Sequence, residues 1–428
     1  MKILIQNAEV FDGKHEVLIH RAHIIIQDNH VEEISIGEVS PESFDRVIDA
    51  KGNVAIPGLI DSHVHLSSTA TNQDSLRVDE IAVKSTRIAK DMLLRGFTTV
   101  RDAGGITYGL KKCIDSGIVD GPRIYPSNGF ISQTCGHGDC RSSRAQVVLP
   151  TGEHISPYMR SGGSVIADGV PEMLKAVREQ LFLGASQIKL MVGGGFASRY
   201  DPIQTVQFTY EEMKAAVDAS ADFGTYVMAH LYTPQSMQRA AKAGIKSFEH
   251  ATFMDDETAR IIRDNEIWVC PCPQFKREED YEQIHSEKIS FSKANAHSDD
   301  AFSKAARNPA QFDELIHKYQ IPIVFGTDCA FGFDFMEKNQ LNDFRYYKKR
   351  FGSFEGLKSA TGNAHELIKL TTYQNPYSDG KLGVLEKGSY ADLLVVRGNP
   401  AADLDVLSGK ENMLLIMKDG KLYKNDLN

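Results

Sequence analysis

Hydrophobic and polar positions alternate along the first 57 residues in short runs that turn signals interrupt. Pairs such as Asp12-Gly13 and Lys51-Gly52 are typical of tight turns between strands. Because successive side chains of a strand point to opposite faces, this alternation predicts strands. The predicted strands cover residues 2–10, 23–27, 30–36 and 47–50. Together they indicate a small β unit.

From residue 58 to about residue 375 the pattern changes to short apolar runs, each followed by a stretch with helical spacing. This alternation is typical of parallel strands that are connected by helices. The runs that we expect to be strands are 58–66, 97–103, 123–130, 187–193, 225–231, 247–251, 267–271 and 321–328. Helices are predicted between them, for example at 81–95, 171–184, 210–223 and 234–243. A closed (β/α)8 TIM-type barrel needs eight strands, so residues 58–375 are predicted to form an α/β barrel of this kind.

The strand pattern returns near the end of the chain, at residues 391–397 and 413–418. We expect these strands to complete the N-terminal β unit. Residues 1–57 and 376–428 would then form one composite β-sandwich domain beside the barrel.

Two polar segments interrupt the barrel pattern. The connection at 129–167 is rich in Gly, Ser, His and Arg, and a long loop at the catalytic face of a barrel is usually functional. We therefore predict that it forms a wall of the active site. The charged segment at 273–307 is predicted to be helical, and its pattern fits either a lid or an oligomer contact.

Composition and charge indicate which partners and which cellular location to expect. The chain is 42% hydrophobic and 25% charged, and its net charge of -9 argues against nucleic acid or an anionic membrane as a partner. The N-terminus lacks a secretory pattern, no stretch is long enough to span a membrane, and we expect a cytoplasmic protein. The cysteines are expected to be reduced, with Cys270 and Cys272 as small buried residues in a strand and Cys135 and Cys140 not ligating metal.

Polar residues with metal-binding side chains follow five of the predicted strands. His63 and His65 close the first strand, and residues two apart on a strand share a face. The remaining candidates, each after an apolar run, are Lys189, His230, His250 and Asp328. Because the carboxyl ends of barrel strands meet at one face, the sequence predicts a metal site there.

The chain resembles the amidohydrolase superfamily of metal-dependent hydrolases along essentially its whole length. Residues 57–65 (PGLIDSHVH) are similar to the superfamily's opening signature, and 392–396 (DLLVV) to its closing strand. Residues 188–195 (IKLMVGGG), 136–139 (GHGD) and 230–233 (HLYT) resemble the branch of Xaa-Pro and Xaa-Arg dipeptidases and related carboxypeptidases, which includes imidazolonepropionase-like amidohydrolases.

This resemblance implies two divalent metal ions and a lysine carboxylated on its amine. One metal would be held by His63, His65 and Asp328, the other by His230 and His250, with Lys189 bridging both. Zinc suits the imidazole-rich ligands, although manganese, iron and cobalt are also compatible with them. Two metals that share a water make hydroxide available near neutral pH.

Several residues are candidates for handling the substrate. Asp328 is the candidate general base, which would pass a proton to the leaving amine. The expected contacts to a substrate carboxylate or carbonyl come from Tyr232, His137, Arg141 and Arg239, and His137 is also a candidate catalytic residue.

The predicted activity is removal of a C-terminal amino acid from a dipeptide or an N-acyl amino acid. Alternatives are hydrolysis of a non-peptide amide, lactam or carbamate, and a single-metal deaminase or cyclic-imide hydrolase, which Lys189 argues against. A non-catalytic protein with this fold is a further alternative, which the complete ligand set opposes. A small-molecule or dipeptide substrate and a homo-oligomer are expected. The side-chain preference depends on whether Asp139 or Asp201 lies near the leaving group, which the sequence leaves open.

Overall fold

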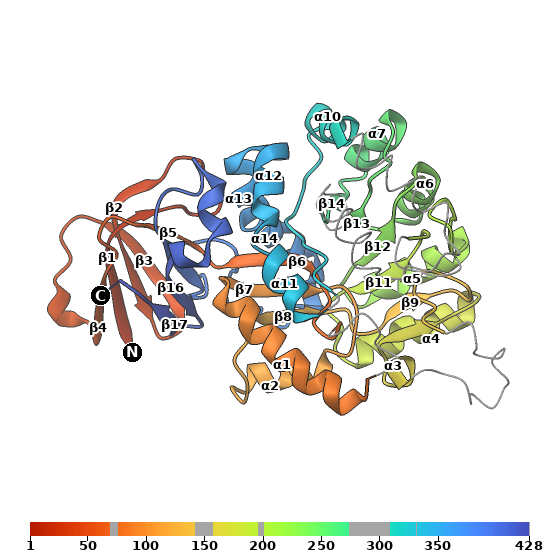
Figure 1. Cartoon of the computed structure of the whole chain (residues 1–428), viewed down its shortest axis with the longest axis horizontal. Coiled ribbons are helices and arrows are strands. Elements are labelled where there is room, and N and C mark those ends of the chain that lie inside the picture. Colours follow the sequence, from red (N-terminus) through yellow and green to blue (C-terminus); the bar gives the residue numbers. More distant parts are fainter. Residues whose placement is uncertain (69–75, 142–156, 196–200, 274–308, 331, 428) are drawn as a thin grey trace.

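The computed structural model describes the chain except residues 69–75, 142–156, 196–200, 274–308, 331 and 428. Figure 1 shows a β-rich part that contains both chain ends, and beside it a larger part in which helices flank parallel strands. In the part of the chain that the structure describes, no helix is both long and apolar enough to cross a membrane.

Strands from both ends of the chain form one eight-stranded sheet. Its order is β17-β16-β15-β5-β1-β2-β3, and β4 pairs with β1. The strands are β1 (Lys2–Val10), β2 (Ile19–Gln27), β3 (His30–Ile36), β4 (Arg46–Asp49), β5 (Val54–Pro57), β15 (Leu393–Val396), β16 (Met413–Lys418) and β17 (Lys421–Asn425). The antiparallel pairing of β5 with β15 joins the N-terminal strands to the C-terminal ones.

Strand β15 is buried on both faces. Leu393 and Val395 pack in the core of the terminal sheet, whereas Leu394 and Val396 pack against the large core of the helical part. A strand that is covered on both sides reads as a continuous apolar run rather than an alternating one. This explains the sequence LLVV and places the terminal sheet directly against the helical part.

The larger part contains parallel strands in two sheets. One has the order β6-β7-β8 and the other β10-β9-β11-β12-β13-β14. The strands are β6 (Leu59–Val64), β7 (Phe97–Asp102), β8 (Arg123–Pro126), β9 (Phe130–Ser132), β10 (Ser164–Ile166), β11 (Ile188–Met191), β12 (Val227–Leu231), β13 (Ser247–His250) and β14 (Trp268–Cys270). All their pairings are parallel.

Helices follow the parallel strands along the chain and lie outside them (Figure 1). They are α1 (Val78–Leu94), α2 (Tyr108–Asp115), α3 (Pro157–Arg160), α4 (Val170–Phe182), α5 (Tyr210–Asp222), α6 (Pro234–Ala243), α7 (Asp256–Asp264), α10 (Pro309–Tyr319), α11 (Phe333–Asn339), α12 (Asp343–Phe351), α13 (Ser353–Ser359) and α14 (Gly362–Ile368). Capping explains two of these ends: Thr209 and Glu212 form a capping box where α5 begins, and α6 ends at Gly244 in a left-handed conformation.

The predicted strand at 123–130 is wrong as one element, because the structure divides it into β8 and β9. Asn128 adopts a left-handed backbone (φ 55), which interrupts an extended run and which Asn tolerates better than most residues. β8 continues the sheet of β7, whereas β9 pairs with β11 and β10. The predicted wall at 129–167 therefore contains regular structure, namely β9, α3 and β10.

Within the predicted strand at 321–328 only one isolated bridge is present, from Ile323 to Val269 of β14. Cys329, the next residue after this range, bridges to Val64 of β6. Pro322 has no backbone N–H to donate, which weakens a regular ladder here. The segment nevertheless lies between β14 and β6. The predicted helical segment at 273–307 lies, apart from its first residue, outside the described residues.

Arg123, the first residue of β8, links the parallel strands to the terminal sheet. Its guanidinium donates hydrogen bonds to Asp392 (Nε to Oδ2, 3.2 Å) and Asp419 (Nη2 to Oδ1, 2.6 Å). It also lies over the ring of Tyr390, 3.8 Å from the centroid. Arg123 and Asp392 are both buried, so the loss of either charge would leave the other without compensation away from water.

We expect Arg123→Met to lower the free energy of unfolding by about 3 kcal/mol, because it leaves the buried Asp392 carboxylate without its cation. Urea denaturation measures this change. Lys421→Met is the matched control, since its exposed ion pair with Asp120 (3.5 Å) should contribute less than about 0.5 kcal/mol. Equal effects of the two substitutions would show that the ion pairs of Arg123 do not stabilise the contact between the parallel strands and the terminal sheet.

Candidate active site

Parallel pairing brings the predicted ligands to the same edge of the strands. Met191 pairs with His230, and Leu231 pairs with His250, so β11, β12 and β13 end side by side. On the other side, the backbone N–H of Asp328 donates to the carbonyl of His63 (2.7 Å). Residues that are far apart in sequence thus meet at one place.

The carboxylate of Asp328 lies between two imidazoles. Its Oδ1 is 3.4 Å from Nε2 of His63 and 3.3 Å from Nε2 of His65. His250 completes this group, because ligand atoms of His63, His250 and Asp328 all lie within 4.8 Å of one another. Two imidazoles and one carboxylate are a typical ligand set for a divalent transition metal.

His230 and Tyr232 lie beside His250. The ring centroids of His230 and His250 are 4.7 Å apart, and the ring of Tyr232 stacks on His250 at 4.8 Å. All three side chains are buried. One further imidazole, that of His230, therefore stands next to the first group, and the phenol of Tyr232 lies beside it.

Lys189 is the unusual member of the site. It is 1% exposed, and among the residues that the structure describes none forms a salt bridge with it. Burial lowers the pKa of its ammonium group, because a charge without a close counter-ion is unfavourable away from water. Its positive charge in turn lowers the pKa of His63 and His230.

Burial and the neighbouring charges also set the proton affinity of the imidazoles and of Asp328. Burial, followed by the charge of Lys189, lowers the pKa of His63 to about 4. Burial alone would raise the pKa of Asp328, but His63 and His65 outweigh it and hold the pKa below its ordinary value. A neutral imidazole and an ionised carboxylate are the forms that bind metals.

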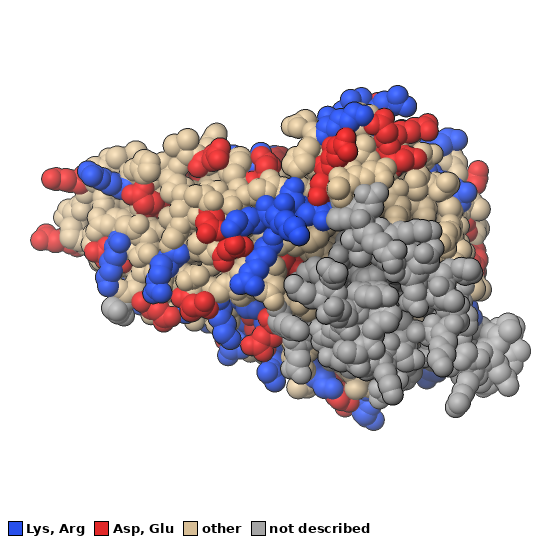
Figure 2. Space-filling model, turned by 45° about the horizontal axis from the view of Figure 1, so that its top comes forward, with Lys and Arg blue, Asp and Glu red and all other residues tan. Residues whose placement is uncertain are grey.

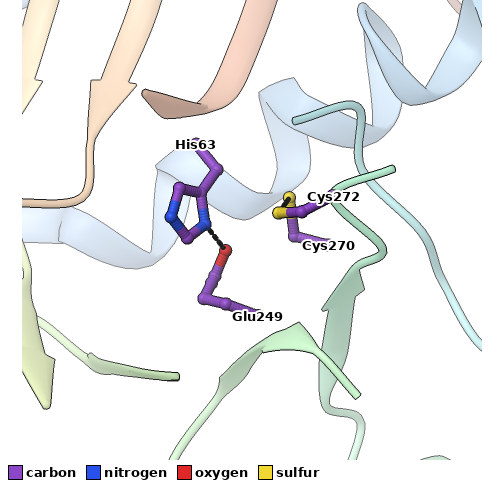
Figure 3. Close-up of side chains that lie close together, drawn as sticks. All are labelled: His63, Glu249, Cys270 and Cys272. Carbon is purple, nitrogen blue, oxygen red and sulfur yellow. Dashed lines mark hydrogen bonds and ion pairs between the residues drawn. The ribbon is translucent and has the colours of Figure 1, made fainter. Parts of the chain in front are cut away.

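A buried ion pair supports His63 from below (Figure 3). Nδ1 of His63 lies 2.6 Å from Oε2 of Glu249. Glu249 also accepts hydrogen bonds from Arg101 (2.9 and 3.1 Å) and Ser247 (2.7 Å). Burial alone would raise the pKa of Glu249, but Arg101 and the bond to His63 lower it to about 2. This support fixes the ring so that Nε2 faces Asp328.

The sequence interpretation missed Arg101 and Glu249. Strand alternation would place Glu249 and His250 on opposite faces, but His250 has a left-handed backbone (φ 73) that breaks the alternation. The sequence did contain a signal for this pair, because Arg101 and Glu249 each lie inside an apolar strand run. A charge that is buried in this way needs a partner of opposite charge.

Cys270 and Cys272 lie beside this support, with their sulfurs 3.5 Å apart (Figure 3). Both are fully buried and free, in agreement with the predicted small buried residues. Their sulfurs, His63 and Glu249 form a second group with ligand atoms within 4.8 Å. However, each oxygen of Glu249 already accepts two hydrogen bonds, and burial raises the pKa of both thiols. We therefore interpret this group as packing beneath His63.

The predicted substrate contacts lie in different places. His137 reaches the site, since its ring stacks on His230 with centroids 4.0 Å apart and planes at 7°. Arg141 is paired with Asp139 in the same loop. Arg239 is exposed on α6 and donates to the carbonyl of Phe208 (2.8 Å). The structure thus brings His137 and Tyr232 to the imidazoles, but neither arginine is in contact with them among the described interactions.

Comparison with known proteins gives a consistent result. The sequence pattern of the amidohydrolase family matches residues 54–423. Ochratoxinase from Aspergillus niger is 29% identical over 426 residues, which are 95% of this chain and 83% of that protein. Among solved structures, an amidohydrolase is 33% identical with a TM-score of 0.89 and full coverage of both chains. A prolidase crystallised with N-methylphosphonate-L-proline is 31% identical with a TM-score of 0.87, covering 99% of this chain and 100% of that one.

Proposed function

Because this chain belongs to the amidohydrolase family, we propose that it hydrolyses the amide bond before a C-terminal amino acid, in dipeptides or N-acyl amino acids. The family and its hydrolase relatives support a hydrolytic enzyme. The observation that carries this proposal is that His63, His250 and Asp328 come together as possible metal ligands, while Lys189 is buried and forms no salt bridge with the residues that the structure describes. The solved prolidase, whose bound molecule is a proline derivative, supports a dipeptide substrate.

The residues present fit two divalent metal ions, with zinc as the preferred one. We assign one ion to His63, His65 and Asp328, and the other to His230 and His250. Lys189 would bridge them as a carbamate, which requires a neutral amine, and burial lowers the pKa of Lys189 in that direction. When bound, such ions polarise a carbonyl and lower the pKa of water.

The chain's own residues would position the substrate and move the proton. Asp328 is ionised, lies between His63 and His65, and would accept a proton from water and pass it to the leaving amine. Tyr232, buried beside His250, would donate a hydrogen bond to the substrate's carboxylate or carbonyl. His137, which is stacked on His230, would bind the same group.

We also propose that the parallel strands close into a (β/α)8 barrel. The family is built on a barrel domain. Hydrogen bonds join the 321–329 segment to both neighbours, since the N–H of Val324 donates to Val269 (3.0 Å) and the N–H of Ser62 donates to Phe325 (2.8 Å). In this proposal residues 58–375 form the barrel, and residues 1–57 and 376–428 form the composite β domain.

A second candidate is hydrolysis of a non-peptide amide at the same metals. The likeness to ochratoxinase favours it, because that relative is named for a toxin and not for a peptide. The two candidates share the site described above and differ in what the surrounding loops accept.

Hydrolysis of a panel of Xaa-Pro, Xaa-Arg and Xaa-Leu dipeptides and their N-acetyl forms tests the proposal. We expect cleavage of at least one of these series, with loss of more than 99% of the rate after chelation and recovery with zinc and bicarbonate. Bicarbonate is included as the source of the carbamate on Lys189. A panel left intact by zinc-loaded protein, together with cleavage of a non-peptide amide, would favour the second candidate.

A further inference from the structure

A polar cavity lies where the helical part meets the segment between β15 and β16. Its volume is about 540 Å³, which is within the usual range for small-molecule sites of roughly 300 to 1,000 Å³. One wall is the last part of α1, and another is α11 with the start of α12. The third consists of two short 3-10 helices, η4 (Leu404–Ser408) and η5 (Lys410–Asn412). None of the candidate metal ligands is among the described residues that line the cavity, so it is separate from the active site.

Arg95, which follows the last residue of α1, brings a buried positive charge to this cavity. It is only 6% exposed. Its Nε donates a hydrogen bond to Oε1 of Gln340 (2.7 Å), and the two Nη groups have no hydrogen-bond partner among the described residues. Because Nε2 of Gln340 donates to Asp61 (3.0 Å), the amide is fixed and holds the guanidinium from one side only.

The acidic residues of the cavity do not neutralise Arg95. Three of the four described acidic residues that line it form salt bridges with other cations, namely Asp91 with Arg87 (3.4 Å), Glu337 with Lys410 (3.4 Å) and Asp405 with Lys348 (2.6 Å). The fourth, Glu411, is exposed to water, and no carboxylate that the structure describes forms a salt bridge with Arg95. Burial lowers the pKa of the Arg95 guanidinium, because its charge is removed from water without a close counter-ion.

A second arginine of the cavity also lacks a carboxylate. On the face that Figure 2 shows, Lys and Arg side chains are interspersed with Asp and Glu side chains. Arg345 on α12 lines the cavity, but among the described residues it has no salt-bridge partner. Two arginines without a counter-ion therefore line one space.

The chemistry of the guanidinium group selects the ligand. Its planar N–H groups match two oxygens of a carboxylate or a phosphate, and such charge-assisted hydrogen bonds are stronger than those between neutral groups. An oxyanion in the cavity would also give the buried charge of Arg95 the counter-ion that it lacks. Water would satisfy the N–H groups but would leave the charge unbalanced.

We propose that this cavity is a binding site for a small oxyanion, a carboxylate or a phosphate, which Arg95 and Arg345 hold. The site is independent of the proposed hydrolytic function, because it shares no residue with the candidate metal site.

NMR titration of the full-length protein with inorganic phosphate and, separately, with malonate tests the proposal. The side-chain Nε–H signal of Arg95, assigned by its absence in Arg95→Met, should shift saturably with at least one of these ions. This signal reports on the cavity itself, so an ion that binds at the active site does not produce the result. Tighter binding of malonate would identify a carboxylate as the ligand, and tighter binding of phosphate would identify a phosphate.

Sodium chloride at the same ionic strength is the control for this titration, and it should cause no saturable shift. The absence of a saturable shift with either oxyanion would overturn the proposal. The same shift with chloride would also overturn it, because the effect would then be one of ionic strength.

Isothermal titration calorimetry with the tighter of the two ions measures what Arg95 contributes. Arg95→Met should weaken binding roughly tenfold to hundredfold, because it removes charge-assisted hydrogen bonds. Arg95→Lys keeps the charge but loses the planar fork, so it should weaken binding less than Arg95→Met does. Arg178→Met is the matched control, since it removes an exposed arginine on α4 that does not line the cavity, and it should bind like the wild type.

Arg345→Met provides a second test, should Arg95→Met not fold. Arg345 is exposed, so its replacement should leave the fold intact, and binding should weaken roughly threefold or more. Unchanged binding in the folded variants of both cavity arginines would overturn the proposal, because the ion would then be bound elsewhere. Equal losses in Arg178→Met and in the cavity variants would also overturn it, since they would indicate a general effect of net charge.

Discussion

Replacing Asp328 with Asn should lower kcat for dipeptide hydrolysis by about a thousandfold, because an amide can neither accept a proton nor supply a negative charge to a metal. The carboxylate lies 3.3 to 3.4 Å from two imidazoles, at the point where the candidate ligands meet. Asn is the mildest replacement, since Asp328 has a left-handed backbone (φ 55) that Asn tolerates and Ala does not. Steady-state kinetics on a cleaved dipeptide measures the effect.

The control for this experiment is Asp218→Asn, which changes an exposed carboxylate on α5. It should leave kcat unchanged, and thermal melting should show that both variants are folded. If Asp328→Asn kept more than a tenth of the wild-type kcat, Asp328 would have no part in proton transfer.

Replacing Glu249 with Gln should destabilise the metal-free protein by about 3 to 5 kcal/mol, because Arg101 would remain as a buried charge without its partner. Arg101 and Glu249 are both fully buried and joined by hydrogen bonds of 2.9 and 3.1 Å. His63 would also lose the carboxylate that orients it, so metal affinity should fall roughly tenfold to hundredfold. Urea denaturation and metal competition measure the two effects.

The same substitution should change the dependence of stability on pH. The folded protein holds the pKa of Glu249 at about 2, below its ordinary value of 4.5. The unfolded chain therefore binds more protons between these values, and the stabilisation is complete above about pH 4.5 and disappears as the pH falls toward 2. Metal-free Glu249→Gln should lose less stability than the wild type over this range.

A double variant provides the control for the buried pair. Arg101→Met with Glu249→Leu removes both charges and should be less destabilised than Glu249→Gln alone, because no unpaired charge remains. Equal or greater destabilisation would mean that the packing of these side chains matters more than their charges.

Much of the site was predictable because its residues follow apolar strand runs. Lys189, His230 and His250 lie on neighbouring parallel strands, and the ends of such strands meet whatever the details of the loops. The helices at 210–223 and 234–243 were predictable for the local reason that their first and last residues carry capping signals.

Features that depend on distant partners were not predictable, and one turn signal was overlooked. The run from Arg123 to Phe130 contains the turn pair Asn128-Gly129, and the left-handed Asn128 divides the run into two strands. Arg141 and Arg239 carry the charge expected of a substrate contact, but their partners, Asp139 and the Phe208 carbonyl, are set by loop folding. Sequence identifies candidate charges, whereas the tertiary structure decides which of them face the site.

The most direct test of the central claim is the number of metal ions per chain, measured by elemental analysis in the wild type and in Lys189→Met. Met removes the bridging group without burying a new charge, so the fold should persist. We expect two divalent ions per wild-type chain and no more than one in the variant. One ion per wild-type chain, unchanged in Lys189→Met, would contradict a lysine-bridged pair and favour the single-metal deaminase or cyclic-imide hydrolase.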